Sequence, residues 1–485
     1  MASAEIRVSP ARVIGEIDPR IYGQYVENLT PDDRPIYGGV VDEHGDLRPP
    51  VIDALRHMGV PMIRWGGNYN DVYRWTDGIG SKDSRPVRPN YFWGGMESNQ
   101  FGTHEFLDLC DALSAQPYIS INMGTGGLLE ALGWLEYCNF DGDTAYTAQR
   151  KANGRETPWG VPIWGIGNEA WGFWETCFAP PEDYARDFNQ YAQYMRRLDP
   201  SIQLVAVGHT DRDWNKAVLT TMRVPADYLS IHMYGHSYLE REGNYDQLVA
   251  LPVVFEQELA RVVEDLNAHA SAPIALILDE WNVRHILTDG LRRQSPRQFQ
   301  DALFVAGVFN VYNRFSSHVK AANYVTMVNG NAPIRAWDDT IELTPLYDVF
   351  RLYQQHMTGA AVHVSTSTAT YDVTPFTRVS TPHTVNDQVS AGWVDAAAVV
   401  HPTTQMITLA VVNREPGSTS RVEIHVDGDG RYRFAGAQVI SGSSPSDLTA
   451  TVAEGSIALN KTSEHQWDAA LPPLSITFLQ WQLEP

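Results

Sequence analysis

One stretch of the sequence decides the fold: Trp164-Gly165-Ile166-Gly167-Asn168-Glu169-Ala170-Trp171-Gly172. It begins as a buried strand, because Val161, Ile163 and Ile166 around it are apolar and β-branched. It ends in the small, polar segment Gly-Asn-Glu beside two tryptophans. Indole faces stack on sugar rings, asparagine binds hydroxyl groups, and glutamate can act as a general acid and then a general base. Taken alone, the motif fits a glutamate in an ordinary surface loop equally well.

A second stretch has the same form: Ile274-Ala275-Leu276-Ile277-Leu278-Asp279-Glu280-Trp281-Asn282. The spacing between Glu169 and Glu280 fits three repeats of an eightfold (β/α) barrel, at roughly 30 residues per repeat or more with insertions. Both glutamates are then expected at the C-terminal mouth of one barrel, where barrel enzymes place their chemistry. Two carboxylates that face one pocket are what glycoside hydrolysis requires. The alternative for Glu280 is a structural carboxylate in a salt bridge.

Strand and helix patterns alternate along most of the chain. Apolar strand patterns occur at residues 21–29, 61–65, 117–122, 161–169, 203–207, 228–234, 274–281 and 321–329. Helical patterns lie between many of them, at residues 50–58, 104–115, 128–138, 181–198, 255–269 and 299–312. This alternation predicts an α/β fold, a (β/α)8 TIM barrel over residues 14–355. Residues 1–13 and 356–485 contain only strand patterns and predict an all-β sandwich domain.

Composition narrows the class of protein. The chain has 485 residues, of which 43% are hydrophobic and 19% charged, enough for one large globular domain and a smaller one. Its net charge of −22 disfavours a nucleic-acid partner, and no apolar run is long enough to predict a membrane span. We expect a cytoplasmic location, because the N-terminus lacks the pattern of a secretory signal and the 3 cysteines fit reduced thiols. We expect no metal and no cofactor, because no Cys/His cluster has zinc spacing.

Several polar and aromatic side chains are expected around the two glutamates. His232 and Tyr234 share one face of a strand, and Tyr234 is expected to donate a hydrogen bond to Glu280. Glu27 follows the first barrel strand and is a candidate for binding a sugar hydroxyl, or else a loop charge. Trp75 and Trp93 belong to the long segment 69–100, and a segment of this length in a compact domain is usually functional, so both are candidate pocket walls. We also expect Arg64 to pair with a buried carboxylate, and Gly66-Gly67 to permit a close approach of the backbone.

At this point the sequence resembles glycoside hydrolase family 51, the α-L-arabinofuranosidases. The resemblance runs through most of the chain. The ordered set of motifs is highly specific, although no single motif is. It rests on Tyr22-Gly-Gln-Tyr-Val-Glu27, Ile63-Arg-Trp-Gly-Gly-Asn68, Trp75-Thr-Asp-Gly-Ile-Gly80, Asn99-Gln-Phe-Gly-Thr-His-Glu-Phe106, Glu136-Tyr-Cys-Asn139, Gly165-Ile-Gly-Asn-Glu169 and Asp279-Glu-Trp-Asn-Val283. It implies a (β/α)8 barrel with a C-terminal jelly-roll-type sandwich.

The resemblance also implies roles for single residues. Glu169 corresponds to the acid/base and Glu280 to the nucleophile of a retaining mechanism. The positions that match substrate-binding residues of the family are Asn168, Glu27, His232, Tyr234 and Asn68. The sequence departs from the family pattern at three places: Trp65 runs straight into Gly66 where relatives have Pro, Arg284-His285 replaces the usual aromatic, and Asp339 stands where a pocket Gln is expected.

Because of these departures, the sequence does not determine which sugar the enzyme releases. An α-L-arabinofuranosidase that removes terminal furanosyl residues from arabinose-containing oligosaccharides or polysaccharide side chains is the leading prediction. A related furanosidase, such as a galactofuranosidase, and an endo-β-glucanase or xylanase on the same scaffold are the alternatives. A non-catalytic carbohydrate-binding protein is disfavoured because both glutamates are present. Relatives are commonly oligomeric, so we expect a homo-oligomer.

The substitution Asp339→Gln tests the departure that bears most directly on the sugar. An ionised carboxylate only accepts hydrogen bonds, so Asp339 in the pocket would favour a sugar hydroxyl that donates. We expect Asp339→Gln to change the ratio of kcat/KM values between arabinofuranosides and other furanosides, because kcat/KM carries discrimination between substrates. Nitrophenyl glycosides provide the assay. Wild-type kcat/KM on every substrate would mean that Asp339 faces solvent.

Overall fold

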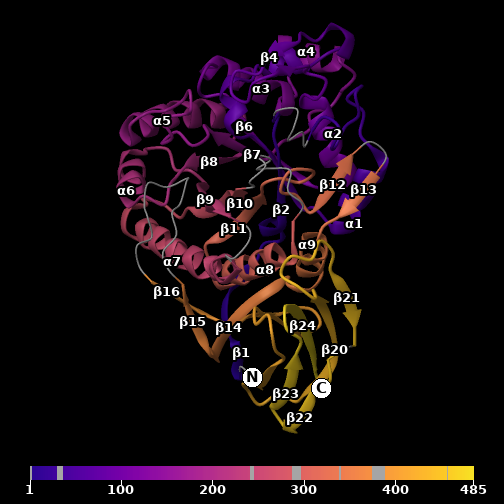
Figure 1. Cartoon of the computed structure of the whole chain (residues 1–485). Coiled ribbons are helices and arrows are strands. Elements are labelled where there is room, and N and C mark those ends of the chain that lie inside the picture. The colour runs from indigo at the N-terminus through magenta and orange to yellow at the C-terminus, as the bar shows by residue number, and fades with distance from the viewer. Residues whose placement is uncertain are drawn as a thin grey trace.

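The computed structural model describes residues 3–29, 36–240, 245–286, 297–337, 340–373, 388–455 and 457–484. Eight strands close into a barrel in which every neighbouring pair is parallel (Figure 1). In barrel order from the N-terminus they are β2 (Gly23–Val26), β3 (Met62–Trp65), β6 (Gln116–Ile121), β7 (Ile163–Ile166), β8 (Gln203–Val207), β9 (Tyr228–Glu240), β10 (Ala275–Ile286) and β11 (Val319–Tyr324). β2, β3 and β7 are buried along their whole length, and their residues are mostly apolar apart from Gln24 of β2 and Arg64 of β3.

Helices surround the barrel and bury the outward faces of its strands (Figure 1). They are α1 (Pro49–Met58), α2 (Thr103–Leu113), α3 (Leu128–Asn139), α4 (Ala145–Ala152), α5 (Pro181–Leu198), α6 (Arg212–Thr221), α7 (Tyr245–His269), α8 (Phe299–Arg314) and α9 (Pro345–His356). The sequence of α5 explains its bounds. Pro181 lies in its first turn with Glu182 and Asp183, and Arg196 and Arg197 lie in its last turn, so the charges match the helix dipole.

The inside of the barrel is filled by side chains. One side chain from each of seven strands contributes to an inner layer: Met62, Tyr118, Ile163, Val205, Tyr228, Ile277 and Ala321. This layer makes the barrel a packed core, so polar side chains nearer the C-terminal ends of the strands rest on a fixed base. Between β3 and α2 the chain forms three short 3-10 helices, η2 (Asn68–Val72), η3 (Trp75–Gly78) and η4 (Lys82–Ser84), and the two-stranded sheet of β4 (Arg88–Pro89) and β5 (Met96–Glu97).

The C-terminal part of the chain is mostly sheet. Ten strands pair in the order β21-β20-β24-β18-β17-β14-β1-β19-β23-β22. They are β1 (Ser3–Ile17), β14 (Gly359–Thr368), β17 (Val394–Val400), β18 (Met406–Asn413), β19 (Ser420–Val426), β20 (Tyr432–Ser441), β21 (Thr451–Glu454), β22 (Asn460–Ser463), β23 (Gln466–Leu471) and β24 (Ser475–Leu483). The first strand of the chain therefore belongs to this sheet, between β14 and β19 (Figure 1). Two further pairs are β12 (Ile334–Trp337) with β13 (Thr340–Leu343), and β15 (Thr370–Val373) with β16 (Val389–Gly392).

Helices α8 and α9 join the sheet domain to the barrel. The Tyr353 ring on α9 meets the Phe478 ring of β24 edge to face, with the ring centroids 5.1 Å apart. The Tyr353 hydroxyl donates to the carbonyl of Ala306 and to Asn310 Oδ1 on α8. Arg314, at the end of α8, pairs with Asp395 of β17 at 3.1 Å. Both apolar and charged contacts therefore hold the two parts together.

The predicted fold class is confirmed: an eight-stranded parallel barrel flanked by helices precedes a domain that is mostly sheet. The sequence patterns missed α4, α6 and α9. The jelly-roll topology and the domain limits of 14–355, and of 1–13 plus 356–485, stay predictions. In the described part of the chain, no helix combines the length and the apolar character needed to span a membrane.

Phe478→Ala tests the coupling between the sheet domain and the barrel. Phe478 is 1% exposed and packs against Tyr353 and His356. Removing the ring leaves a cavity at this contact, so we expect a loss of about 3–5 kcal/mol in the free energy of unfolding, measured by urea denaturation. The control Leu448→Ala, at a side chain that is 51% exposed, should change it by less than about 0.5 kcal/mol. Equal effects of the two substitutions would contradict the coupling.

Candidate active site

The C-terminal ends of the barrel strands bring most of the predicted residues together. Glu27 follows β2, Asn68 follows β3, and Glu169 follows β7, whereas His232 lies in β9 and Glu280 in β10. One pocket in this region is lined by Tyr25, Glu27, Leu29, Asn68, Trp93, Tyr234, Glu280, Val325, Thr326, Gly330 and Asn331. The barrel mouth therefore holds the candidate active site.

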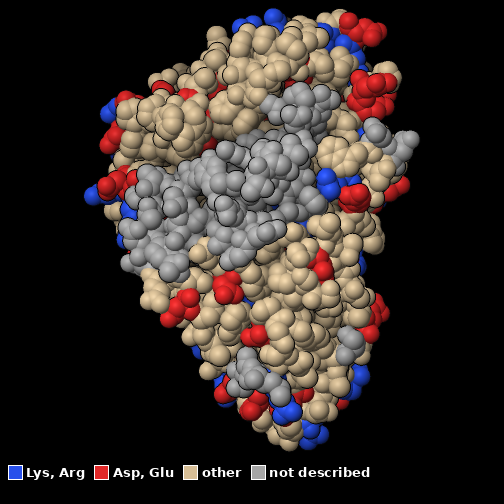
Figure 2. Space-filling view, viewed as in Figure 1, with Lys and Arg blue, Asp and Glu red and all other residues tan. Residues whose placement is uncertain are grey.

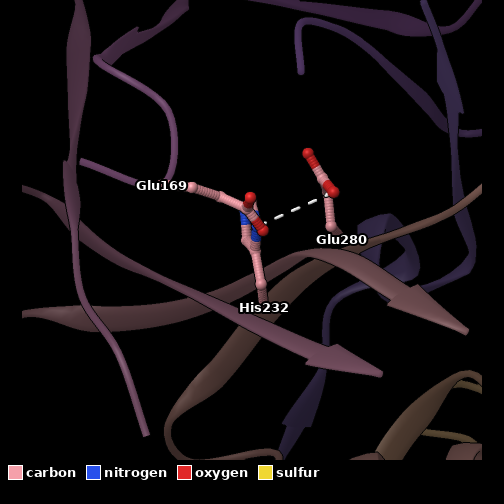
Figure 3. A group of neighbouring side chains, drawn as sticks. All are labelled: Glu169, His232 and Glu280. Carbon is pink, nitrogen blue, oxygen red and sulfur yellow. Dashed lines mark hydrogen bonds and ion pairs between the residues drawn. The ribbon is translucent and has the colours of Figure 1, made fainter. Parts of the chain in front are cut away.

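The two glutamates meet at His232 (Figure 3). One carboxylate oxygen of Glu169, one of Glu280 and a ring nitrogen of His232 lie within 4.8 Å of one another. His232 Nδ1 lies 2.9 Å from Glu169 Oε1 and 3.7 Å from Glu280 Oε2. Tyr234 donates its hydroxyl proton to Glu280 Oε2 at 2.7 Å, which is the contact expected from the sequence. Glu169 and Glu280 are 7% and 3% exposed, so these charge interactions act away from bulk water.

Arg64 lies beneath the pair and is 1% exposed. Its guanidinium group donates to Glu280 Oε1 at 2.8 Å and to Asn168 Oδ1 at 2.7 Å, and it lies 3.3 Å from Asp279 Oδ2. One rigid fork therefore fixes two neighbouring carboxylates of β10 and the amide next to Glu169. This arrangement confirms the expectation that Arg64 pairs with a buried carboxylate.

Asp279 organises the floor of the site. Its oxygens accept hydrogen bonds from Ser230 Oγ at 2.5 Å and from Tyr118 Oη at 2.8 Å. His232 Nε2 lies 3.5 Å from Asp279 Oδ1. Burial alone would raise the pKa of Asp279, but Arg64, His232 and Ser230 hold it below its usual range. Asp279 therefore stays ionised and anchors the two buried cations.

His232 is the second buried cation. Burial alone would lower its pKa, but Glu280, Asp279 and Glu169 together raise it to about 10. Both ring nitrogens then carry protons and donate to carboxylates. The ligand atoms of Glu169, His232 and Glu280 have the spacing of a metal site, but a metal requires a neutral imidazole. The donor set therefore fits a proton-holding site better than a metal site.

Glu27 lines the same pocket as Glu280 and Tyr234. Its carboxylate accepts hydrogen bonds from Tyr25 Oη at 2.7 Å, from the Tyr69 backbone N–H at 2.9 Å and from Trp93 Nε1 at 2.8 Å. Burial and the charge of Glu280 raise the pKa of Glu27 to about 7, although these three hydrogen bonds oppose the shift. Glu27 is therefore a bound, buried carboxyl group and not a loop charge.

Backbone conformation places these side chains. Gly67 has a φ of 89°, and a Cβ on it would lie 1.8 Å from Tyr25 Oη, so this position requires glycine. The expectation of a close approach at Gly66-Gly67 is thus confirmed. Glu169 has a φ of 40°, in the left-handed region that residues with a Cβ seldom adopt. Such backbone strain is typical of functional sites, where the surrounding structure holds the residue in place.

One of the predicted substrate-binding residues, Trp75, lies in the core and not at the pocket. Trp75 is 1% exposed, stacks on Trp134 and donates its indole N–H to the carbonyl of Glu130. It is a core residue, so its prediction as a pocket wall does not agree with the structure. The segment 69–100 places some of its aromatic residues in the core and others at the pocket, and the sequence pattern does not distinguish the two groups. Asp339 lies outside the described residues, and its role stays a prediction.

Other polar groups at the site were not identified from sequence. Trp174 donates its indole N–H to Glu169 Oε2 at 2.8 Å. Glu175 accepts a hydrogen bond from Asn168 Nδ2 at 3.1 Å and also one from Asn68 Nδ2. Asp279 precedes Glu280 in its motif, and Trp174-Glu175 lies only a few residues beyond Glu169. Closeness in sequence to the motifs of Glu169 and Glu280 was a signal that could have pointed to these residues. It does not show, however, whether a side chain points into the site.

A closed parallel barrel with two buried glutamates at its C-terminal mouth defines the class of this protein as a glycoside hydrolase. A family model described as "Alpha-L-arabinofuranosidase 1 domain" matches residues 54–249, and one described as "Alpha-L-arabinofuranosidase C-terminal domain" matches residues 279–475. The chain belongs to the α-L-arabinofuranosidases of glycoside hydrolase family 51, as its motifs predicted.

Individual relatives match along nearly the whole chain. A probable α-L-arabinofuranosidase C of Aspergillus niger is 32% identical over 509 residues, which cover 99% of this chain and 97% of that protein. An α-L-arabinofuranosidase from Thermotoga maritima, solved as an arabinose complex, is 32% identical with a TM-score of 0.88 and covers 99% of this chain and 100% of its own. The thermostable GH51 α-L-arabinofuranosidase from Thermotoga petrophila has the same identity and coverage, with a TM-score of 0.87.

The raised pKa of His232 gives a prediction for stability against pH. A histidine whose pKa rises from 6.5 to about 10 on folding stabilises the fold fully below pH 6.5, and this contribution is lost as the pH rises towards 10. We expect wild type to exceed His232→Gln in free energy of unfolding by about 2–4 kcal/mol at pH 6, with a much smaller difference at pH 10. Urea denaturation across this range measures it. His44→Gln, at an exposed histidine, is the control and should show no such trend. A constant difference between wild type and His232→Gln would contradict the protonated state.

Proposed function

We propose that this protein is a retaining, exo-acting α-L-arabinofuranosidase, with Glu280 as the nucleophile and Glu169 as the acid/base. The observation that supports the proposal is the close approach of the two carboxylates: one oxygen of Glu169 and one of Glu280 lie within 4.8 Å of each other. Retaining glycosidases hold their two carboxyl groups about 5–5.5 Å apart, whereas inverting enzymes leave about 6.5–9.5 Å for a water molecule. The separation therefore favours direct attack by a carboxylate.

The first half-reaction uses Glu280. An oxygen of Glu280 attacks the anomeric carbon of the arabinofuranosyl residue, and the bond to the leaving-group oxygen breaks. Arg64 and the Tyr234 hydroxyl hold the two oxygens of Glu280 in a fixed orientation, so the nucleophile is aimed before substrate binds. Glu169 donates its proton to the departing oxygen, which leaves as an alcohol.

The second half-reaction uses Glu169 as a base. With its proton gone, the Glu169 carboxylate takes a proton from water, and the oxygen of this water attacks the anomeric carbon of the glycosyl-enzyme. The bond to Glu280 breaks and arabinose leaves with its original anomeric configuration. Hydrogen bonds from His232 and Trp174 fix both oxygens of Glu169 and keep it at the place where leaving group and water exchange.

The pocket supports exo action on a small sugar. Trp93, from the segment between β3 and α2, closes one wall and holds Glu27, while Asn68 and Tyr234 line other sides. Glu27 can accept a hydrogen bond from a sugar hydroxyl. The named relatives are α-L-arabinofuranosidases, which favours arabinose-containing glycans over galactofuranosides as substrates. Among the described residues, the pocket lining offers no comparable support for the open cleft that an endo-glucanase or xylanase would need.

Substitution of the two glutamates tests their roles. Glu280→Ala should lower kcat on nitrophenyl α-L-arabinofuranoside by roughly 10⁴-fold, because no nucleophile remains. Glu169→Ala should spare the first step for a good leaving group and slow the second. Azide should restore turnover, because this anion attacks the glycosyl-enzyme directly and needs no base to remove a proton. The product should be a glycosyl azide of retained configuration, identified by NMR. Glu182→Ala, at an exposed glutamate of α5, is the control and should keep wild-type activity.

Two outcomes would contradict the proposal. If azide rescued Glu280→Ala to give a glycosyl azide of retained configuration, and rescued Glu169→Ala to give one of inverted configuration, the roles of the two glutamates would be reversed. If wild type hydrolysed internal bonds of a glucan or xylan faster than any nitrophenyl furanoside, the enzyme would be an endo-hydrolase. A substrate panel that includes nitrophenyl galactofuranoside distinguishes an arabinofuranosidase from a galactofuranosidase.

A further inference from the structure

Glu175 is a buried carboxyl group that the proposed reaction does not use directly. It follows the aromatic segment Trp171–Trp174 and is 4% exposed. Its Oε1 accepts hydrogen bonds from the side-chain amides of Asn68 and Asn168, the second at 3.1 Å. Its Oε2 is buried and has no hydrogen-bond partner within the described residues. One oxygen therefore holds two amides while the other makes no such contact.

Both amides adjoin the acid/base. Asn68 Nδ2 lies 3.4 Å from Glu169 Oε2, so this amide stands between Glu169 and Glu175. Asn168 accepts a hydrogen bond from Arg64 Nη2 through its Oδ1. Because a guanidinium group only donates, Asn168 must turn Oδ1 towards Arg64, and its Nδ2 then needs an acceptor on the other side. Glu175 Oε1 is that acceptor, and it sets the orientation of both amides.

The charges around Glu175 favour an un-ionised acid. Asp71 of η2 is 0% exposed and Glu169 is 7% exposed, and both repel a negative charge on Glu175. Within the described residues, the buried cations Arg64 and His232 pair with Glu169, Asp279 and Glu280, and neither comes within 4 Å of Glu175. Burial, with the charges of Asp71 and Glu169, raises the pKa of Glu175 to about 10.

We propose that Glu175 is a positioning residue for the glycosidase reaction and that it acts as an un-ionised carboxylic acid. Its carbonyl oxygen Oε1 holds Asn68 and Asn168, which flank Glu169, and its proton resides on Oε2. An un-ionised Glu175 orients the two amides without placing another negative charge beside Glu169. This inference rests on the proposed function, because the orientation of these amides matters to the reaction only if Glu169 is the acid/base.

Two substitutions at Glu175 test the proposal. Glutamine keeps a neutral side chain with an acceptor oxygen, so Glu175→Gln should keep kcat within about twofold of wild type, with an unchanged pH profile. Alanine leaves both amides without their acceptor, so Glu175→Ala should lower kcat on nitrophenyl α-L-arabinofuranoside roughly 10–100-fold, with a smaller change in KM. Glu182→Gln, at the exposed glutamate of α5, is the matched control and should behave as wild type.

Several results would overturn the proposal. An equal loss of kcat in Glu175→Gln and Glu175→Ala would show that the reaction requires a charge at this position. Wild-type kcat in Glu175→Ala with a lowered Tm would show a purely structural role. If Glu175→Ala fails to fold, the pH profile of Glu175→Gln shows whether Glu175 is un-ionised or charged in the wild type. Removing a negative charge next to Glu169 would move the high-pH limb to lower pH, whereas replacing a neutral acid leaves it in place.

An infrared difference spectrum separates this inference from the proposed function. Wild type minus Glu175→Gln, recorded at neutral pH, should contain the C=O stretch of a protonated carboxyl group. Carboxylate bands in its place would overturn the un-ionised state. The measurement needs no turnover, so it stays informative if wild type hydrolyses no arabinofuranoside, a result that would refute the proposed function alone.

Discussion

The site depends on the buried guanidinium group of Arg64. A single fork reaches Glu280, Asp279 and Asn168, which come from β10 and from the end of β7. Burying a cation costs several kcal/mol unless partners repay it, and here two carboxylates and an amide do so. Arg64 belongs to β3, which pairs with β2 and β6 but not with β7 or β10. The fork therefore ties together strands that the barrel's backbone hydrogen bonds leave unconnected.

This constraint explains why the barrel interior is divided into two layers. Apolar side chains such as Met62, Ile163 and Ile277 fill the lower part. Above them, Tyr118 and Ser230 direct hydroxyl groups at Asp279, which in turn faces Arg64 and His232. These groups hydrogen-bond to one another, which favours a fixed geometry in the polar layer. Glu169 and Glu280 contact members of this layer, which fixes the positions of their carboxylates.

The sequence predicted the fold and the centre of the site better than the site's rim. Continuous apolar strands that end in Glu169 and Glu280 follow from the burial of parallel strands, and the barrel places their ends together. Trp75 marks the limit of such reasoning. The same sequence pattern fits a tryptophan in the core and a tryptophan in the pocket wall. Glu175 shows the opposite case, because its position after an exposed aromatic turn gives no sign that the backbone returns it to the site. Directions of side chains in irregular segments depend on tertiary contacts, which local patterns do not encode.

The balance of charge links the polar layer to the reaction. Below pH 7, Glu27, Asp71 and Glu175 are un-ionised, whereas Asp279, Arg64 and His232 are charged. In the proposed mechanism, Glu280 supplies the second negative charge of this cluster and Glu169 carries the transferable proton. In the proposed first step, Glu280 loses its charge to a covalent bond while Glu169 gains one by giving up its proton. The net charge of the buried cluster is then the same before and after glycosylation, and the second step reverses both changes. His232 lies within 3.7 Å of a carboxylate oxygen of each glutamate and Arg64 pairs with Glu280, so a cation can stabilise the charge on either glutamate. The charge therefore moves between the glutamates without reorganising the surrounding groups, which is the condition under which a preorganised site lowers a barrier.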